Sequence, residues 1–221
     1  LRNTQVAYGG ITEHNSSKKI ESLLQNGVEF INVSPNVADL PQVNTNQHIL
    51  VRPNTDVAFM LGVAYLLEVE ELLDRQFLST HCKGYETFAR YLLGKDDGIQ
   101  KSPEWASAIT DIKAEEIVSL ARKMAAKRTF ISGAWSLQRA HHGEQPFWMI
   151  VVLSSMLGGI GLKGQGFGFG YGAEGFIGSD YLRFPWATLP KGRNPEGFAI
   201  PVARIADMLL NPGDHVEYDG D

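Results

Sequence analysis

A run of nine residues, 135–143, holds more chemically capable side chains than an ordinary connection between elements needs. It reads Trp-Ser-Leu-Gln-Arg-Ala-His-His-Gly. The guanidinium of Arg139 suits bidentate recognition of a phosphate or of a polar oxygen, and Trp135 offers a flat wall for a planar ring or a small cation. We therefore expect Arg139 and Trp135 to line a ligand site, with Gln138 beside them. The alternative is a solvated loop whose Trp135 packs into the core.

A second candidate site lies at Pro53-Asn-Thr-Asp56, where a short apolar run ends and a helical pattern begins. Backbone amides at a helix start, the hydroxyl of Thr55 and the carboxylate of Asp56 can together read the edge of a purine or a pterin. The alternative is plain capping of the helix by Thr55 or Asp56. A third candidate, Ser34-Pro-Asn36, follows an earlier apolar run.

Other motifs carry less chemistry. The single cysteine, Cys82, excludes an intrachain disulfide and a thiolate cluster. No HExxH or CxxC motif accompanies the adjacent His141 and His142, so we expect no metal site built from protein ligands alone. The spacing Gly170-x-Gly172-x-x-Gly175 follows no strand pattern and lacks the acidic residue that dinucleotide binding requires, so we expect no NAD site.

Composition excludes several classes of protein. Apolar residues make up 43% of the chain and charged residues 20%, which is typical of a folded globular protein. The net charge is −5 without a basic stripe, and this disfavours nucleic acid as a partner. The longest apolar run, residues 147–162, is interrupted by serines and glycines and is shorter than the roughly 20 residues that span a bilayer. We expect a buried helix there and no membrane span.

Strand patterns alternate with helical patterns along most of the chain. The expected strands cover residues 28–33, 48–52 and 129–134. The expected helices lie between Ser16 and Gly27, over 55–67 with helical pieces to Leu93, from Ser102 with Pro103 in the first turn, over 114–126, and from Glu144. This order indicates an α/β fold with a partial doubly wound parallel sheet flanked by helices. Ligands bind at the carboxyl ends of such strands, where the three candidate loops lie.

The texture of the sequence changes near its last quarter. Beyond Leu162 it becomes rich in glycine and punctuated by proline, with a short helical pattern at about 202–210. We therefore predict one domain over residues 1–162 and an irregular extension over 163–221.

Several separate motifs, in order along the chain, resemble those of a known family. They are Arg52-Pro-Asn-Thr-Asp-Val-Ala-Phe-Met-Leu-Gly62, Tyr91-Leu-Leu-Gly94, Asp97-Gly98, Glu104-Trp105-Ala106, Trp135-Ser-Leu-Gln-Arg139, His142-Gly-Glu-Gln-Pro146, Trp148-Met149, Met156-Leu157-Gly158 and Gly161-Leu162. The family is the dimethyl sulfoxide reductase family of molybdopterin oxidoreductases, especially its trimethylamine N-oxide and biotin sulfoxide reductase branch.

The resemblance implies a parent enzyme roughly three to four times this length, wrapped around molybdenum bis(molybdopterin guanine dinucleotide). This chain would be its third, Rossmann-like domain and would hold one of the two dinucleotides. Asn54, Thr55 and Asp56 match the loop that reads the guanine. Trp135, Gln138 and Arg139 match the loop that approaches the pterin and the substrate funnel.

The resemblance also implies a reaction and partners. The parent removes the oxygen atom of a small N- or S-oxide and is re-reduced by a cytochrome or a thiol reductant, as in anaerobic respiration. The remaining domains of the parent are the immediate partners of this chain. The implied compartment is the periplasm, with the cytoplasm as the alternative. By itself the chain is expected to hold no cofactor and to be inactive.

The sequence departs from the family pattern in three ways. Ser34 stands where an acidic residue suited to ribose hydroxyls is usual, although a serine can still hydrogen-bond. Leu162-Lys-Gly-Gln-Gly166 replaces Leu-Pro-Gly-Gly-Gly. The serine that ligates molybdenum, the first strand of the domain and its glycine turn are expected upstream of Leu1.

The residues alone also allow two other interpretations besides part of an enzyme. One is a nonenzymatic Rossmann-like binding or interaction module without a molybdenum site. The other is a structural central domain such as those of thiamine-diphosphate enzymes.

Overall fold

The structure is a computed structural model that describes residues 16–37, 47–169, 192 and 204–214, with side chains from Ile20 onward. The chain divides into two compact units, Leu1–Asp180 and Tyr181–Asp221. The described part of the second unit contains helix α8 (Ile205–Leu210), in which Asp207 forms an ion pair with Arg204 directly before the helix. The other elements belong to the first unit. No helix in the described ranges is long and apolar enough to cross a membrane.

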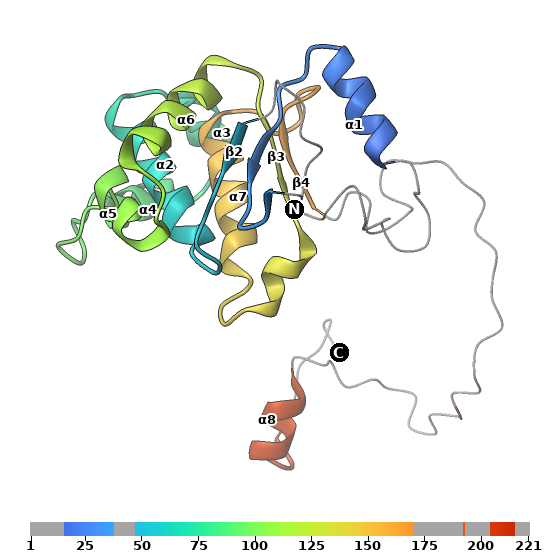
Figure 1. Ribbon diagram of the computed structural model, residues 1–221. Coiled ribbons are helices and arrows are strands. Elements are labelled where there is room, and N and C mark those ends of the chain that lie inside the picture. The colour runs from blue at the N-terminus through green and yellow to red at the C-terminus, as the bar shows by residue number, and fades with distance from the viewer. Residues whose placement is uncertain (1–15, 38–46, 170–191, 193–203, 215–221) are drawn as a thin grey trace. The chain divides into compact units, whose positions relative to one another are not determined.

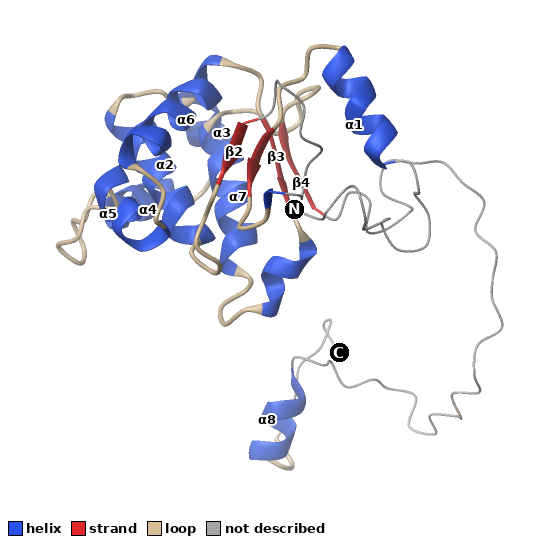
Figure 2. Ribbon diagram, in the orientation of Figure 1, coloured by secondary structure: helices blue, strands red, loops and turns tan. Residues whose placement is uncertain are grey.

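The described strands form two parallel pairs (Figure 2). Strand β1 (Ile31–Val33) pairs with β2 (Gln47–Ile49), and β3 (Phe130–Gly133) pairs with β4 (Gly166–Phe169). Strands expected at 28–33, 48–52 and 129–134 are therefore present, but each is shorter than its apolar run. The mixture of helices with small parallel sheets confirms the α/β class.

Two local expectations differ from the structure. The sequence predicts an irregular extension after Leu162, yet Gly166–Phe169 forms β4 in register with β3. Gly166 has a φ of 87°, a value that favours glycine, and Phe169 packs edge-on against Phe147 with ring centroids 5.0 Å apart. In the loop after β3, Trp135–Arg139 forms the 3-10 helix η2.

The helices begin and end close to the residues that local signals indicate. The side chain of Ser102 accepts a hydrogen bond from the backbone amide of Trp105 at 3.3 Å, and Pro103 occupies the first turn of its helix. The helices of the first unit are α1 (Ser16–Gln25), α2 (Asp56–Val69), α3 (Arg75–His81), α4 (Tyr85–Leu92), α5 (Pro103–Thr110), α6 (Ala114–Ala126) and α7 (Gln145–Met156).

Helix α2 lies at the centre of the core. It is apolar on all sides, as a helix surrounded by protein must be, and it packs against α5, α6 and α7 (Figure 1). Gly62 allows α5 to approach closely, because a Cβ atom at this position would lie 2.7 Å from the Cβ of Ala106. The packing of α2 in the core therefore fixes the position of its first residue, Asp56, at which the loop after β2 ends.

Candidate functional site

Two of the three candidate loops meet at one end of the strands. Figure 1 shows the loop between β2 and α2 at the same end as the segment between β3 and α7. Between them lies a cavity of about 390 Å³, within the range of small-molecule sites. Its lining comes from Asn54, Asp56 and Val57 on one side and from Leu137, residues 140–143, Gln145 and Pro146 on the other.

The loop before α2 is held by α5. Both Nε and Nη2 of Arg52 donate to the carboxylate of Asp111, each at 2.8 Å, and the backbone amide of Arg52 donates to the carbonyl of Thr110 at 3.0 Å. The hydroxyl of Thr55 then donates to the carbonyl of Arg52 at 2.7 Å. Asn54 adopts a left-handed conformation with a φ of 64°, which turns the chain towards the cavity. These hydrogen bonds constrain the conformation of the loop and tie it to α5.

Asp56 is the first residue of α2 and is partly buried in the cavity wall. Burial raises the pKa of its carboxyl group, against the smaller opposing effect of a hydrogen bond from its own backbone amide. The capping alternative does not describe Thr55, whose side chain makes no cap hydrogen bond to the helix. A half-buried carboxyl group without a side-chain partner among the described residues can accept hydrogen bonds from a ligand.

The opposite wall is a tight chain reversal around Gly143. A Cβ atom on Gly143 would lie 2.3 Å from the carbonyl oxygen of Gln138, so only glycine fits. His142 has a φ of 56°, and its ring lies against that of His141 with centroids 3.9 Å apart. Both imidazoles are therefore presented together at the cavity. The described residues contain no cluster of three or more side chains that could hold a metal ion.

The predicted site residues separate into two groups. Asn54 and Asp56 line the cavity. The other five are not among its lining residues: Thr55 is turned towards Arg52, Ser34 is buried at the end of β1, and Trp135, Gln138 and Arg139 lie exposed on η2.

Two of these residues also bear on the alternatives raised by the sequence. Trp135 is 40% exposed, so it is not tucked into the core. The hydroxyl of Ser34 accepts a hydrogen bond from the backbone amide of Asn36 at 3.1 Å, which shows that a serine here organises its own loop.

The cavity is also lined by His141, His142 and Gln145, for which the sequence alone predicts no ligand role. The position of these side chains at the cavity depends on the chain reversal at Gly143. The motif His142-Gly-Glu-Gln-Pro146 was the available signal, because a glycine between polar residues before a helix indicates such a turn.

Comparison with protein families decides the affiliation. The model of the family described as "Molybdopterin oxidoreductase" matches residues 12–199, which include both walls of the cavity. The chain belongs to the molybdopterin oxidoreductase family.

The chain is also similar to individual reductases of this family. The chain is 41% identical to a biotin sulfoxide reductase of Cereibacter sphaeroides over 100% of its length, and 40% identical to a dimethyl sulfoxide/trimethylamine N-oxide reductase of Rhodobacter capsulatus over 95%. It is 42% identical to trimethylamine-N-oxide reductase 1 of Escherichia coli (strain K12) over 87%. The resemblance seen in the motifs is thereby confirmed.

The chain spans only a part of these relatives, between 24% and 30% of their lengths. Among solved structures it is similar to acetylene hydratase of Pelobacter acetylenicus, with a TM-score of 0.54 and 18% sequence identity over 67% of this chain and 20% of that chain. At this identity the similarity concerns the fold alone.

Proposed function

We propose that this chain is the part of a molybdenum-dependent N- or S-oxide reductase that holds one molybdopterin guanine dinucleotide. The observation that carries the proposal is the cavity in which Asn54 and Asp56 face the loop after β3 at the carboxyl ends of parallel strands. Open parallel sheets bind nucleotides at this edge, and in the proposal the two strand pairs belong to one Rossmann-like, doubly wound sheet.

The residues of the cavity fit a guanine. A guanine edge offers N–H donors, and Asp56 supplies a partly buried carboxyl group that lacks a side-chain partner among the described residues. A ligand that donates hydrogen bonds to this carboxylate would restore the charged form that burial disfavours. Asn54 beside it provides an amide that can both donate and accept.

The remaining candidate residues serve the bound group in supporting roles. Arg139, Trp135 and Gln138 lie exposed on η2, adjoining the loop that lines the cavity, where they can contact a pterin or the passage to the substrate. Ser34 lies at the end of β1, where its loop can approach a ribose. When bound, the molybdenum group supplies the redox chemistry of oxygen-atom removal from a small oxide, while this chain binds and orients it.

The proposal extends to the parent enzyme. Its other domains complete the cofactor site, and a cytochrome or a thiol reductant supplies electrons. We place the parent in the periplasm, with a cytoplasmic parent as the alternative.

The test is cofactor content in the full-length enzyme. In Asp56→Asn the carboxylate is lost with little change in shape, so GMP released by acid hydrolysis and molybdenum per protein should both fall at least about tenfold, the equivalent of one charge-assisted hydrogen bond. The control is Asp96→Asn, since Asp96 pairs with Arg90 on the surface and does not line the cavity. Full GMP content in the Asp56 variant would contradict the proposal. A parent that contains neither molybdenum nor pterin would favour a nonenzymatic binding module.

A further inference from the structure

Two polar side chains on β1 and β2 form a hydrogen-bonded pair apart from the cavity. Asn32 on β1 and His48 on β2 are partners in the parallel register, and Nδ2 of Asn32 lies 2.9 Å from Nδ1 of His48, a hydrogen-bond distance. Asn32 is 1% exposed and His48 is half-buried. Neither residue is among those that line the cavity at Asp56.

The pair lies on the face of these strands that is turned away from the core. Side chains alternate between the two faces of a strand. Ile49 belongs to the core, and its register partner Val33 packs against the core. Asn32 and His48, one position earlier in each strand, therefore point to the opposite face.

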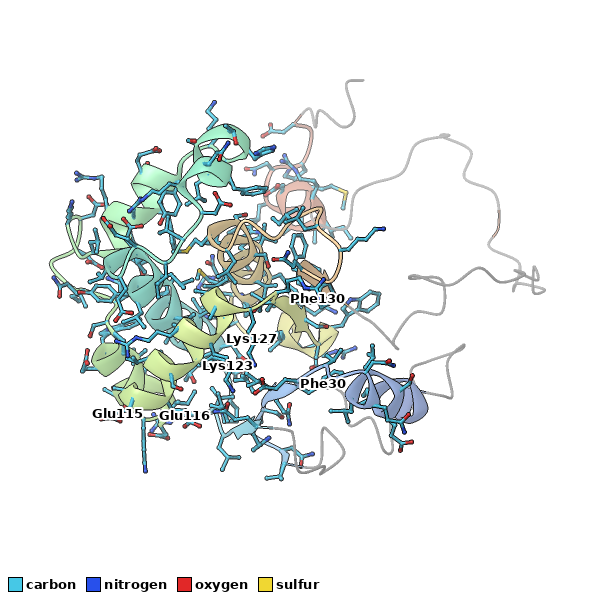
Figure 3. The ribbon with its side chains drawn as sticks, turned by 90° about the horizontal axis from the view of Figure 1, so that it is seen from above. Phe30, Glu115, Glu116, Lys123, Lys127 and Phe130 are labelled. Carbon is cyan, nitrogen blue, oxygen red and sulfur yellow. The ribbon has the colours of Figure 1, made fainter. Side chains whose placement is uncertain are left out.

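Polar groups on the core side of the strands find partners on α6. Figure 3 shows Lys123 and Lys127 reaching from α6 towards these strands. Their ammonium groups donate to the two carboxylate oxygens of Glu29 at 2.6 and 2.8 Å, and Lys123 also donates to Oε1 of Gln47 at 3.4 Å. Because α6 lies on the core side, these donors serve that side and not the face that holds Asn32.

The pair leaves one donor and one acceptor without a partner. Oδ1 of Asn32 and Nε2 of His48 are shielded from solvent, and neither forms a hydrogen bond within the described part of the chain. If Nδ2 of Asn32 donates to Nδ1 of His48, the ring proton lies on Nε2 and Oδ1 is left as an acceptor. If the amide is turned over and the ring has its other tautomer, the remaining groups are again one donor and one acceptor. Both arrangements need a partner that donates and accepts at once.

Thr110 shows how a buried polar side chain is satisfied elsewhere in this chain. It is 0% exposed, and its hydroxyl donates to the carbonyl of Ala106 at 2.8 Å and accepts from the backbone amide of Ile112 at 3.2 Å. A buried polar atom that lacks such a partner lowers the folding equilibrium constant by about tenfold or more. The pair on β1 and β2 therefore requires an additional group to complete its hydrogen bonds.

We propose that Asn32 and His48 form a buried site for one water molecule, which accepts a hydrogen bond from one side chain and donates one to the other. Oδ1 and Nδ2 of Asn32 share one carbon atom, as do Nδ1 and Nε2 of His48, so the two remaining atoms flank the same hydrogen bond. Water is the smallest group that both donates and accepts, and buried waters characteristically satisfy otherwise unpaired polar atoms. A cation is disfavoured, because neither side chain carries a negative charge.

The water site links the two strands directly before a candidate loop. The backbone amide of Ser34 donates to the carbonyl of Ile49 at 3.1 Å, immediately beyond the pair. The water adds a side-chain link to this backbone link, so the start of the loop after β1 is held to β2 twice. The site needs only the two side chains and is independent of the function proposed for the cavity.

A crystal structure of the 221-residue chain at about 1.5 Å resolution tests the site directly. We expect one ordered density peak about 2.7–3.2 Å from both Nε2 of His48 and an amide atom of Asn32, and no such peak at the hydroxyl of Thr110. The lack of a peak between well-ordered side chains of Asn32 and His48 would overturn the proposal. A peak about 2.0–2.1 Å from Nε2 would also overturn it, because that distance identifies a metal ion.

Paired variants measure the same site by stability. His48→Phe keeps a ring but removes both nitrogens, so the unfolding equilibrium constant should rise at least about tenfold. Asn32→Val/His48→Phe removes the whole polar set and should unfold with a constant within about tenfold of that of the unaltered chain, because an apolar pair replaces a satisfied polar one. A double variant that is more than about tenfold more stable would overturn the proposal, since the two atoms would then have been unsatisfied.

Thr110→Val is the matched control for these variants. It breaks hydrogen bonds that involve no water, so it should lose stability while the density peak at Asn32 and His48 stays. If a variant of the pair does not fold, the density in the unaltered chain decides.

Discussion

At the scale of single residues, Asp56 experiences two opposing effects. The start of α2 favours a negative charge, because unsatisfied amides and the helix dipole point there. Partial burial disfavours the charge, and the pKa of the carboxyl group is raised, so burial prevails. Such a residue lowers the stability of the unliganded protein and becomes favourable only when a donor meets it, as is usual for a binding residue.

This balance predicts a pH-dependent effect of Asp56→Asn on the isolated chain. Because the folded-state pKa lies above the unfolded value near 3.8, ionisation costs folding stability as the pH rises through the interval between the two, and that cost is complete above the folded pKa. At pH 7 the Asp56→Asn variant should therefore melt at a higher temperature than the unaltered chain. The difference in melting temperature should shrink as the pH approaches 3.8. Melting curves between pH 4 and 8 measure it. A lower melting temperature of Asp56→Asn at pH 7 would show that the charged carboxylate is stabilising.

Arg139 should matter for activity and little for stability. Its side chain is exposed on η2, so removal in Arg139→Ala should change the free energy of unfolding by less than about 0.5 kcal/mol. In the full-length enzyme we expect kcat/KM for the oxide to fall at least about tenfold, with Arg139→Lys recovering only part because it cannot form a bidentate contact. Arg128→Ala, another exposed arginine, is the control. Unchanged turnover per molybdenum in Arg139→Ala would remove Arg139 from the site.

At the scale of elements, the helices follow from local signals and the strands do so only in part. Helix α6 spans Ala114–Ala126, as its periodicity predicts, because the spacing of apolar side chains is a property of neighbouring residues. Local signals do not predict strand β4, because Gly166-Phe-Gly-Phe169 lacks the β-branched residues of a typical strand. Its conformation depends on pairing with β3, which lies more than 30 residues earlier in the chain. The same limit applies to the cavity: residue types pointed to both loops, but which side chains line it depends on the turn at Gly143.

The contact between α2 and α5 gives a prediction at this scale. In Gly62→Ala the gain in helix propensity, about 1 kcal/mol, is offset by overpacking, since the new methyl group would lie 2.7 Å from the Cβ of Ala106. We expect a net loss of about 1–2 kcal/mol in the free energy of unfolding, measured by urea denaturation. The double variant Gly62→Ala/Ala106→Gly makes room for the methyl group. If it is no more stable than the sum of the single changes predicts, close packing is not what selects glycine at position 62.

At the scale of the whole molecule, the core and the site have different requirements. Among the residues that the structure describes, α5, α6 and α7 pack around α2 and bury the core within the first unit. The cavity, in contrast, is built by two loops of a chain that spans only 24–30% of its relatives. A cofactor that contacts this chain alone forms only part of the interactions that offset its loss of translational and rotational freedom on binding. We therefore expect the isolated chain to fold but not to retain the cofactor.

The purified 221-residue chain should unfold cooperatively, yet show neither oxide reductase activity nor retained molybdenum. The core predicts the cooperative transition, because one contiguous cluster of buried and partly buried side chains joins helices α2 to α7 to both strand pairs. The cavity of about 390 Å³ predicts the missing activity, because two loops of one chain cover only part of a large cofactor, and ligands in stable sites are usually buried over most of their surface. Thermal unfolding, metal analysis and a viologen-linked assay with trimethylamine N-oxide measure the three properties, with the full-length enzyme as the positive control. Turnover by the isolated chain with bound molybdenum would mean that the grip on the cofactor lies within these residues and that the other domains serve a different purpose.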